Sequence, residues 1–148
     1  MGLISTTLNG EYIMKRLQTV FVGLLVLAMS SAFAKESPTS VDGAKTVNAS
    51  EAKLLFDNGA LFVDVRSNKD WAAGRIPDAV HIELKKVFSE ATLGKEAKKS
   101  EPIVIYCNGV SCMRSSKASA KAVSWGFTNI HYYRLGYPDW KSAGYPTE

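Results

Sequence analysis

Stretches with helical and strand-like patterns alternate along this chain of 148 residues. This alternation predicts an α/β fold, a single domain with a central parallel sheet and helices on both faces. The stretches 60–65 and 103–106 are apolar without alternation, as are strands that a parallel sheet buries on both faces. An apolar content of 46% with 22% charged residues agrees with one globular domain plus a short extension.

The beginning of the chain has the charged, apolar and small-residue order of a secretory signal. An apolar run over residues 20–29 follows a basic pair, and Ala32 and Ala34 stand where a signal peptidase reads. We expect residues 1–34 to be a signal peptide cleaved after Ala34, so that the protein is exported to the periplasm or secreted. The alternative is a membrane anchor, but the run is about half of the roughly 20 residues that span a bilayer. We therefore expect membrane contact only through this signal segment.

Met14 stands directly before the basic pair Lys15-Arg16, which is where such a signal normally starts. We interpret Met14 as the true initiator and residues 1–13 as a gene-start error or an added extension. Export would place both cysteines of the protein in an oxidising compartment, where an unprotected thiol does not persist.

The polar stretch 35–46 contains Pro38 and Gly43 and is expected to be a flexible leader. The folded domain is expected to span residues 47–148 and to begin with a short strand at Val47. A parallel sheet binds ligands outside the carboxyl ends of its strands, so the loops after the strands are where a site is expected.

The first helix is expected to start at Asn48 or Ser50, because short polar side chains accept hydrogen bonds from the free amides of a helix start. Its apolar residues Leu54 and Leu55 are expected to face the core. The remaining elements follow in order: a strand over 60–65, a short helix over 68–73, a strand over 79–82, a helix over 84–91, an exposed connection over 92–101, a strand over 103–106, a helix over 115–125, a strand over 129–133 and a last helical turn over 138–143.

Both cysteines lie in the loop between the strand 103–106 and the helix that follows it. A helix N-terminus and successive loop amides stabilise an anion at the carboxyl end of a strand. Cys107 stands at that position, and Arg114 adds a positive charge at the helix start. Such surroundings lower the pKa of a cysteine and make its thiolate a nucleophile. We interpret Cys107 as the chemical centre; the alternative is a buried free cysteine that only packs.

A family pattern is carried by four stretches in order: Asp64-Val65-Arg66 followed by Asp70-Trp71, the turn Gly74-Arg75-Ile76-Pro77-Asp78-Ala79, the loop from Tyr106-Cys107 to Arg114-Ser115, and Leu135-Gly136 to Trp140 followed by Ala143-Gly144-Tyr145-Pro146. Together they resemble the rhodanese homology domain, the sulfurtransferase family, over nearly all of residues 47–148. The resemblance implies a single rhodanese-like domain. It also implies that no metal or organic cofactor is needed, because a cysteine persulfide carries the chemistry.

The loop departs from the family in its length. The commonest single-domain rhodaneses place five steps between the catalytic cysteine and an Arg-Ser pair, whereas seven steps separate Cys107 from Arg114. The phosphatases of the same fold have six steps and usually carry a His before the cysteine, where this chain has Tyr106. The spacing fits neither pattern, which leaves the substrate open.

The resemblance implies transfer of sulfane sulfur. A Cys107 thiolate would attack the outer sulfur of a small anionic donor such as thiosulfate, become a persulfide, and pass that sulfur to a thiol or cyanide. The donor is expected to be held by the loop residues Asn108, Gly109, Val110, Ser111, Arg114 and Ser115, together with Arg66. Asp64 and Asp70 are expected to support the structure, and an ion pair with Asp70 is the stronger alternative role for Arg66.

Cys112, the second cysteine, has three interpretations. It could resolve the Cys107 persulfide by forming a disulfide, form that disulfide as a protected resting state that an exported thiol reductant opens, or only pack. The oxidising compartment favours the two redox roles. Zinc held by both cysteines, His81 and His131 satisfies the ligand count, but the spacing matches no zinc pattern, so no metal is expected.

Two other classes of function stand beside sulfur transfer. One is a thiol–disulfide oxidoreductase that uses Cys107 and Cys112, and the other is a non-catalytic binding module with the rhodanese fold. Nucleic-acid binding is not expected, because the net charge of +4 is spread along the chain without a basic stripe of interleaved aromatic residues. The protein is expected to act as a monomer.

Overall fold

A computed structural model of the chain describes residues 34–148. The expected signal peptide and the expected start at Met14 lie outside the described residues, apart from Ala34 at the cleavage site. No helix within residues 34–148 combines the length and the apolar character that crossing a membrane requires.

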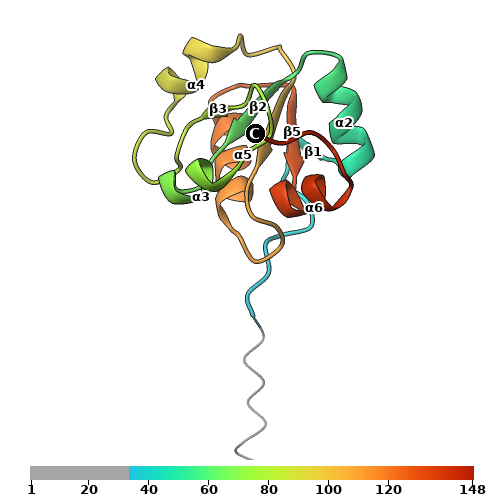
Figure 1. Cartoon of the computed structure of the whole chain (residues 1–148). Coiled ribbons are helices and arrows are strands. Elements are labelled where there is room, and N and C mark those ends of the chain that lie inside the picture. The colour runs from blue at the N-terminus through green and yellow to red at the C-terminus, as the bar shows by residue number, and fades with distance from the viewer. Residues whose placement is uncertain (1–33) are drawn as a thin grey trace, which may run out of the picture. The chain divides into compact units, whose positions relative to one another are not determined.

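Five parallel strands form one sheet in the order β1-β5-β4-β2-β3 (Figure 1). The strands are β1 (Ala44–Thr46), β2 (Leu61–Asp64), β3 (Val80–His81), β4 (Ile103–Tyr106) and β5 (Ile130–Tyr133). β4 lies between β2 and β5, with Ile105 opposite Val63 on one side and Tyr132 on the other. All four residues of β4 are buried, as its unbroken apolar sequence predicts for a central parallel strand.

Helices cover both faces of the sheet, which confirms the predicted architecture (Figure 1). The helices are α2 (Ala49–Asp57), α3 (Asn68–Ala73), α4 (Glu90–Glu96), α5 (Arg114–Ser124) and α6 (Gly136–Ser142). On one face, Leu93 of α4 and Ala118 of α5 pack in a core with alternate residues of β2 and β4. On the other face, Ala52 of α2 and Trp140 of α6 pack with the intervening strand residues. Alternation of side chains along each strand thus builds two apolar layers from one sheet.

The stretch 35–46 was expected to be a flexible leader, but it is packed against the domain. Its residues 44–46 form β1, so the first strand precedes Val47, where the sequence placed it. Ser37 is buried, its backbone N–H donates to the Val110 carbonyl at 2.7 Å, and its own carbonyl accepts from Arg134 at 2.8 Å. These hydrogen bonds give the polar leader a fixed place, and the packed domain therefore begins before residue 47.

Asn48, one of the two predicted caps, is the N-cap of helix α2. The Asn48 side chain accepts from the Glu51 backbone N–H at 2.9 Å, and the Glu51 carboxylate accepts from the Asn48 N–H at 3.0 Å. This reciprocal pair is a capping box. The prediction that Leu54 faces the core is wrong, because Leu54 is 64% exposed. The helix turns Ala52 into the core instead, with Leu55 packed at its margin.

The helix expected over residues 84–91 is also displaced. The chain after β3 instead makes a turn in which the Glu83 carbonyl accepts hydrogen bonds from the N–H groups of residues 86–88. Helix α4 then begins at Glu90, and its N-cap Ser89 forms a capping box with Thr92. Leu93 is fully buried, so the stretch 92–101, expected to be exposed, contributes to the core.

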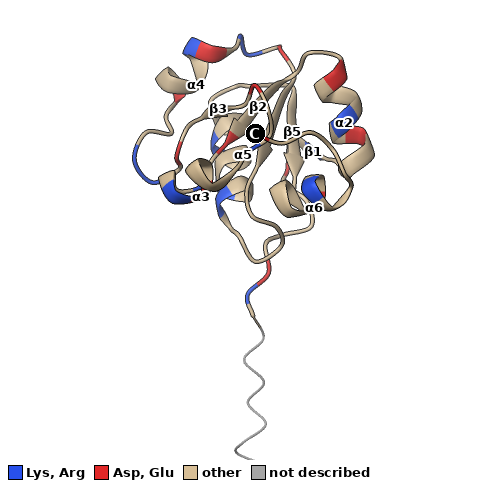
Figure 2. Cartoon of the chain, viewed as in Figure 1, with Lys and Arg blue, Asp and Glu red and all other residues tan. Residues whose placement is uncertain are grey.

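Charged residues are distributed over several helices and loops (Figure 2). On α2, Lys53 binds Asp57 one turn further along at 2.6 Å. Such exposed pairs on a helix stabilise it by only about 0.2–0.5 kcal/mol. Two further ion pairs lie at the carboxyl edge of the sheet: Arg66–Asp64, which is buried, and Arg114–Glu83, which is partly buried.

Candidate active site

The loop after β4 joins the central strand to helix α5 and contains both cysteines. Cys107 follows Tyr106 directly, and Cys112 lies two residues before the helix begins. The two residues form a disulfide, with their Cα atoms 6.3 Å apart. Cys107 is 0% exposed and packs in the core, whereas Cys112 is partly exposed. Of the two sulfur-bearing residues, the solvent therefore reaches Cys112.

The backbone of Cys107 is fixed by the loop that follows β5. The Tyr137 N–H donates to the Cys107 carbonyl at 2.9 Å. The approach depends on Gly136, which has a φ of +62°, and a side chain on Gly136 would collide with the Cys107 carbonyl. The glycine is required both for the left-handed backbone and for the close contact between the two loops. The family pattern Leu135-Gly136 thus has a physical role at the site.

The rest of the loop is held by hydrogen bonds of its own and from the leader. The Cys112 N–H donates to the Gly109 carbonyl at 3.0 Å, which closes a turn between the two cysteines. Gly109 has a φ of +103° in this turn. The Val110 carbonyl accepts from Ser37. The distance between the two cysteines is therefore set by a turn that is anchored at its middle as well as at its strand end.

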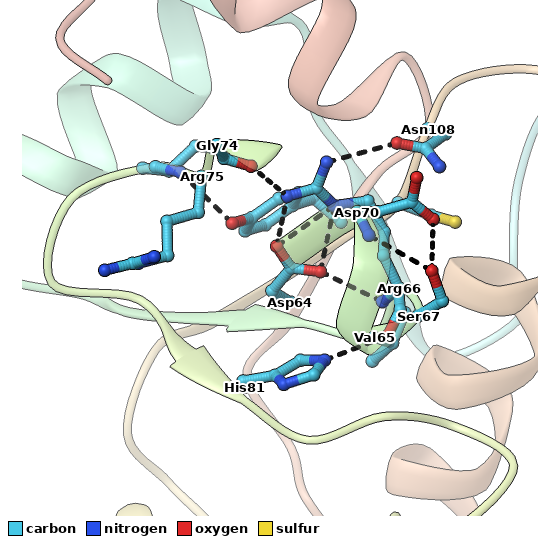
Figure 3. Close-up of polar contacts among 12 residues, drawn as sticks. Asp64, Val65, Arg66, Ser67, Asp70, Gly74, Arg75, His81 and Asn108 are labelled. Atoms are coloured by element: carbon cyan, nitrogen blue, oxygen red, sulfur yellow. Dashed lines mark hydrogen bonds and ion pairs between the residues drawn. The ribbon is translucent and has the colours of Figure 1, made fainter. Parts of the chain in front are cut away.

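Arg66, which follows β2, contacts Asn108 of the cysteine-containing loop through its side chain (Figure 3). Its guanidinium binds both carboxylate oxygens of Asp64, with Nη2 2.6 Å from Oδ2 and Nε 3.0 Å from Oδ1. Nη2 also donates to the Gly74 carbonyl at 2.7 Å, and Nη1 donates to Asn108 Oδ1 at 3.2 Å. The aromatic ring of Tyr137 lies 4.5 Å from the guanidinium carbon. All of these partners hold Arg66 as a cation within the protein.

The ion pair of Arg66 corrects the sequence-based expectation. Asp64, not Asp70, is its close partner, and both side chains of the pair are almost completely buried. Burial disfavours the charge of Arg66, but the hydrogen bonds and the charge of Asp64 outweigh burial and raise its pKa. Arg66 is 2% exposed, so the structure uses it to position Asn108, next to Cys107, rather than to face a donor.

Asp70 lies on the other side of this cluster, at the start of α3. The Ser67 hydroxyl donates to Asp70 Oδ2 at 2.7 Å, and the Asp70 N–H donates to Ser67 Oγ at 3.2 Å. Hydrogen bonding from Ser67, and to a smaller extent from Asn108, lowers the pKa of Asp70. The hydrogen bond from Arg66 Nη1 to Asn108 Oδ1 is the contact that restrains the side chain of the residue following Cys107.

Arg114, the first residue of α5, was expected to face an anionic donor but binds a carboxylate of the protein. Its Nη1 lies 2.5 Å from Glu83 Oε1 and donates to the Val65 carbonyl at 3.3 Å. Burial acts to raise the pKa of Glu83, but the hydrogen bond and charge of Arg114 outweigh it and lower that pKa. The positive charge of Arg114 is therefore compensated by Glu83 in this structure.

The other predicted donor-binding residues differ in exposure. Asn108 and Ser111 are exposed, Gly109 and Val110 are partly exposed, and Ser115 is fully buried in the first turn of α5. Ser115 therefore lies inside the protein, away from solvent. The two histidines that were considered as zinc ligands have other partners: His81 stacks on Trp71 with Nε2 2.9 Å from the Arg66 carbonyl, and His131 lies beside Asn129.

Sequence reasoning missed two residues that shape the site, Glu83 and Tyr137. Glu83 was detectable as a lone carboxylate directly after the strand that ends at Ile82, at the same edge of the sheet as the cysteines. Tyr137 follows Gly136 in the last family motif, and it holds Cys107 through its backbone N–H and Arg66 through its ring.

Comparisons with known proteins show which family and which folds the chain is similar to. A family model described as "Rhodanese-like domain" matches residues 48–143. The thiosulfate sulfurtransferase GlpE of Pseudomonas syringae is 32% identical over 105 residues, which cover 70% of this chain and 92% of that protein. The human single-domain sulfurtransferase TSTD1 has a similar structure, with a TM-score of 0.55, 28% identity and coverage of 67% of this chain and 96% of that one. A Bacillus halodurans protein matches with a TM-score of 0.63 and 26% identity, over 71% of this chain and 77% of that one.

Proposed function

The chain belongs to the rhodanese-like domain family, and we propose that it is a sulfurtransferase that moves sulfane sulfur through a persulfide on Cys107. The observation that supports this most directly is the place of Cys107. It stands at the carboxyl end of the central strand, in a loop whose backbone is fixed on both sides and leads into the N-terminus of an eleven-residue helix. The two sulfurtransferase relatives are similar over most of their own length.

The chemistry starts from the reduced loop. The Cys107 thiolate attacks the outer sulfur of thiosulfate, the sulfur–sulfur bond of the donor breaks, and sulfite leaves with the bonding electrons. The sulfur that stays on Cys107 forms a persulfide, which then passes it to an acceptor thiol or to cyanide. Loop amides and the positive end of α5 stabilise the anion at each stage. This route uses no metal or organic cofactor.

Intact-mass analysis tests the proposal. The Cys112→Ser variant, which lacks the second thiol of the loop, is reduced, desalted and treated with thiosulfate, and we expect its mass to rise by one sulfur atom while one sulfite is released. Fragmentation should place the added sulfur on Cys107. A protein that releases no sulfite and gains no sulfur under these conditions would contradict the proposed function.

Arg114 is expected to contribute to donor binding even though Glu83 compensates its charge. Arg114→Ala should lower kcat/KM for thiosulfate by about ten- to a hundredfold, the scale of one lost charge-assisted contact. Glu83→Gln is the matched variant, because it keeps the side-chain size and removes the negative charge beside Arg114. We expect Glu83→Gln to lower the KM for thiosulfate. Unchanged steady-state kinetics in both variants would show that the pair only supports the fold.

A thiol–disulfide oxidoreductase is the second candidate, and the Cys107–Cys112 disulfide is the observation that favours it. Such an enzyme would exchange electrons with a partner dithiol and would not react with thiosulfate. The mass experiment separates the two functions, since only a sulfurtransferase gains a sulfur atom. A non-catalytic binding module would show neither reaction.

We also propose that the protein is exported and acts as a monomer, with a small anionic sulfur donor, a thiol or cyanide acceptor and an exported thiol reductant as partners. The charged, apolar and small-residue order before Lys35 supports export. N-terminal sequencing of the exported form should therefore return Lys35 as the first residue. An intact N-terminus recovered with the membrane fraction would indicate an anchor.

A further inference from the structure

Cys112 is the feature of the site that sulfur transfer to an external acceptor does not use. Its bond to Cys107 shows that the loop can bring the two sulfur atoms into contact. The turn closed by the Cys112 N–H and the Gly109 carbonyl lies between them. Because the Cys107 backbone and the middle of the loop are both anchored, the Cys112 thiol lies next to any sulfur atom that is bound to Cys107.

On the basis of the persulfide proposed above, we infer that Cys112 discharges it as hydrosulfide, so that the enzyme converts the transferred sulfur to sulfide. The Cys112 sulfur attacks Sγ of Cys107, and the bond between Sγ and the outer sulfur breaks. The outer sulfur leaves as hydrosulfide with the proton of the Cys112 thiol. The two cysteine thiols are oxidised to a disulfide while the sulfane sulfur is reduced by two electrons. The product of this step is the disulfide that the structure contains.

The burial of the two cysteines determines how the cycle is completed. Thiolates attack disulfides at a sulfur that they can reach, and Cys107 is 0% exposed while Cys112 is partly exposed. A dithiol reductant therefore attacks the Cys112 sulfur and displaces Cys107 as a thiolate at the end of the strand. The second thiol of the reductant then releases Cys112. For each thiosulfate, one dithiol becomes a disulfide, and sulfite and hydrogen sulfide are formed.

The same burial explains why the oxidised form would not accept a donor. The Cys107 sulfur is bonded and enclosed, so thiosulfate cannot reach it until the disulfide is opened. The enzyme therefore needs a dithiol to reduce the Cys107–Cys112 disulfide before each round of sulfur transfer.

A single-turnover experiment without external thiols tests the inference. Reduced and desalted wild-type protein, Cys112→Ser and Cys107→Ser are each mixed with excess thiosulfate and quenched in acid with a thiol-alkylating reagent. We expect the wild type to release one sulfite and one hydrosulfide per protein and to end with no alkylated cysteine. We expect Cys112→Ser to release one sulfite and no hydrosulfide and to retain one added sulfur atom. Cys107→Ser should release neither product.

The outcomes separate this inference from the proposed function. If the wild type releases sulfite but keeps the added sulfur on either cysteine, hydrosulfide discharge is wrong while persulfide formation holds. Equal hydrosulfide release by the wild type and Cys112→Ser also overturns the role of Cys112. No sulfite from the wild type and from Cys112→Ser contradicts both the proposed function and the inference.

Discussion

Cys107→Ser is expected to lower sulfur transfer by at least about a thousandfold, the scale seen when an enzyme loses its nucleophile. Serine has nearly the size of cysteine, and the site is fully buried, so the substitution adds no bulk to the core. The hydroxyl does not form an anion near neutral pH and cannot take a sulfur atom from thiosulfate. The Tyr137 N–H still binds the backbone carbonyl of residue 107, which keeps the loop in place.

Cys112→Ser is the matched control for this prediction, because either substitution removes the same disulfide. Any effect that comes from losing the disulfide should be equal in the two variants. Only Cys107→Ser should also lose sulfite release from thiosulfate, measured on reduced protein, and far-ultraviolet circular dichroism should show the fold in both. Sulfite release by Cys107→Ser within a few-fold of wild type would show that Cys107 is not the nucleophile.

The central part of the fold could be predicted because its signals are local. The apolar run at residues 103–106 and the strand end at Asp64 mark buried parallel strands, and the structure has β4 and β2 there. The helix expected over 84–91 failed for a reason that is also local. The apolar residues of 84–91 have helical spacing. The Glu83 carbonyl instead accepts hydrogen bonds from the N–H groups of a turn, and Ser89 caps the helix that follows. The capping pattern Ser89–Thr92 outweighs the apolar spacing.

The position of Cys107 could be predicted for the same reason, since a strand, a glycine-containing loop and a helix follow one another in the sequence. The partners of the two arginines could not. Spacing at i,i+4 favours pairing only inside a helix, and Arg66 precedes α3, which begins at Asn68. Glu83 is 31 residues from Arg114, so their contact depends on how β3 and β4 are placed in the sheet. Contacts of this kind are set by tertiary structure rather than by local pattern.

Arg66 is the residue whose loss is expected to affect stability most. Arg66→Ala leaves the Asp64 carboxylate buried without its partner, and it also removes the donors that bind the Gly74 carbonyl and Asn108. Removing one partner of a buried ion pair costs about 3–5 kcal/mol, because the remaining charge stays away from water. We therefore expect Arg66→Ala to lower the free energy of unfolding by that amount, measured by urea denaturation of the reduced mature protein.

Two further variants make the result specific to the geometry of Arg66. Arg75→Ala breaks an exposed arginine pair, that with Glu148, and should cost at most about 1 kcal/mol. Arg66→Lys keeps the positive charge but lacks the planar fork that binds Asp64 and reaches Asn108 together. It should therefore lose less stability than Arg66→Ala. It should still transfer sulfur more slowly than its folded fraction predicts, because Asn108, next to Cys107, loses its hydrogen bond from residue 66. Equal unfolding free energies for Arg66→Ala and Arg75→Ala would show that the buried Arg66–Asp64 pair does not stabilise the end of β2. Full activity in Arg66→Lys would show that the active-site loop does not need the Arg66 guanidinium.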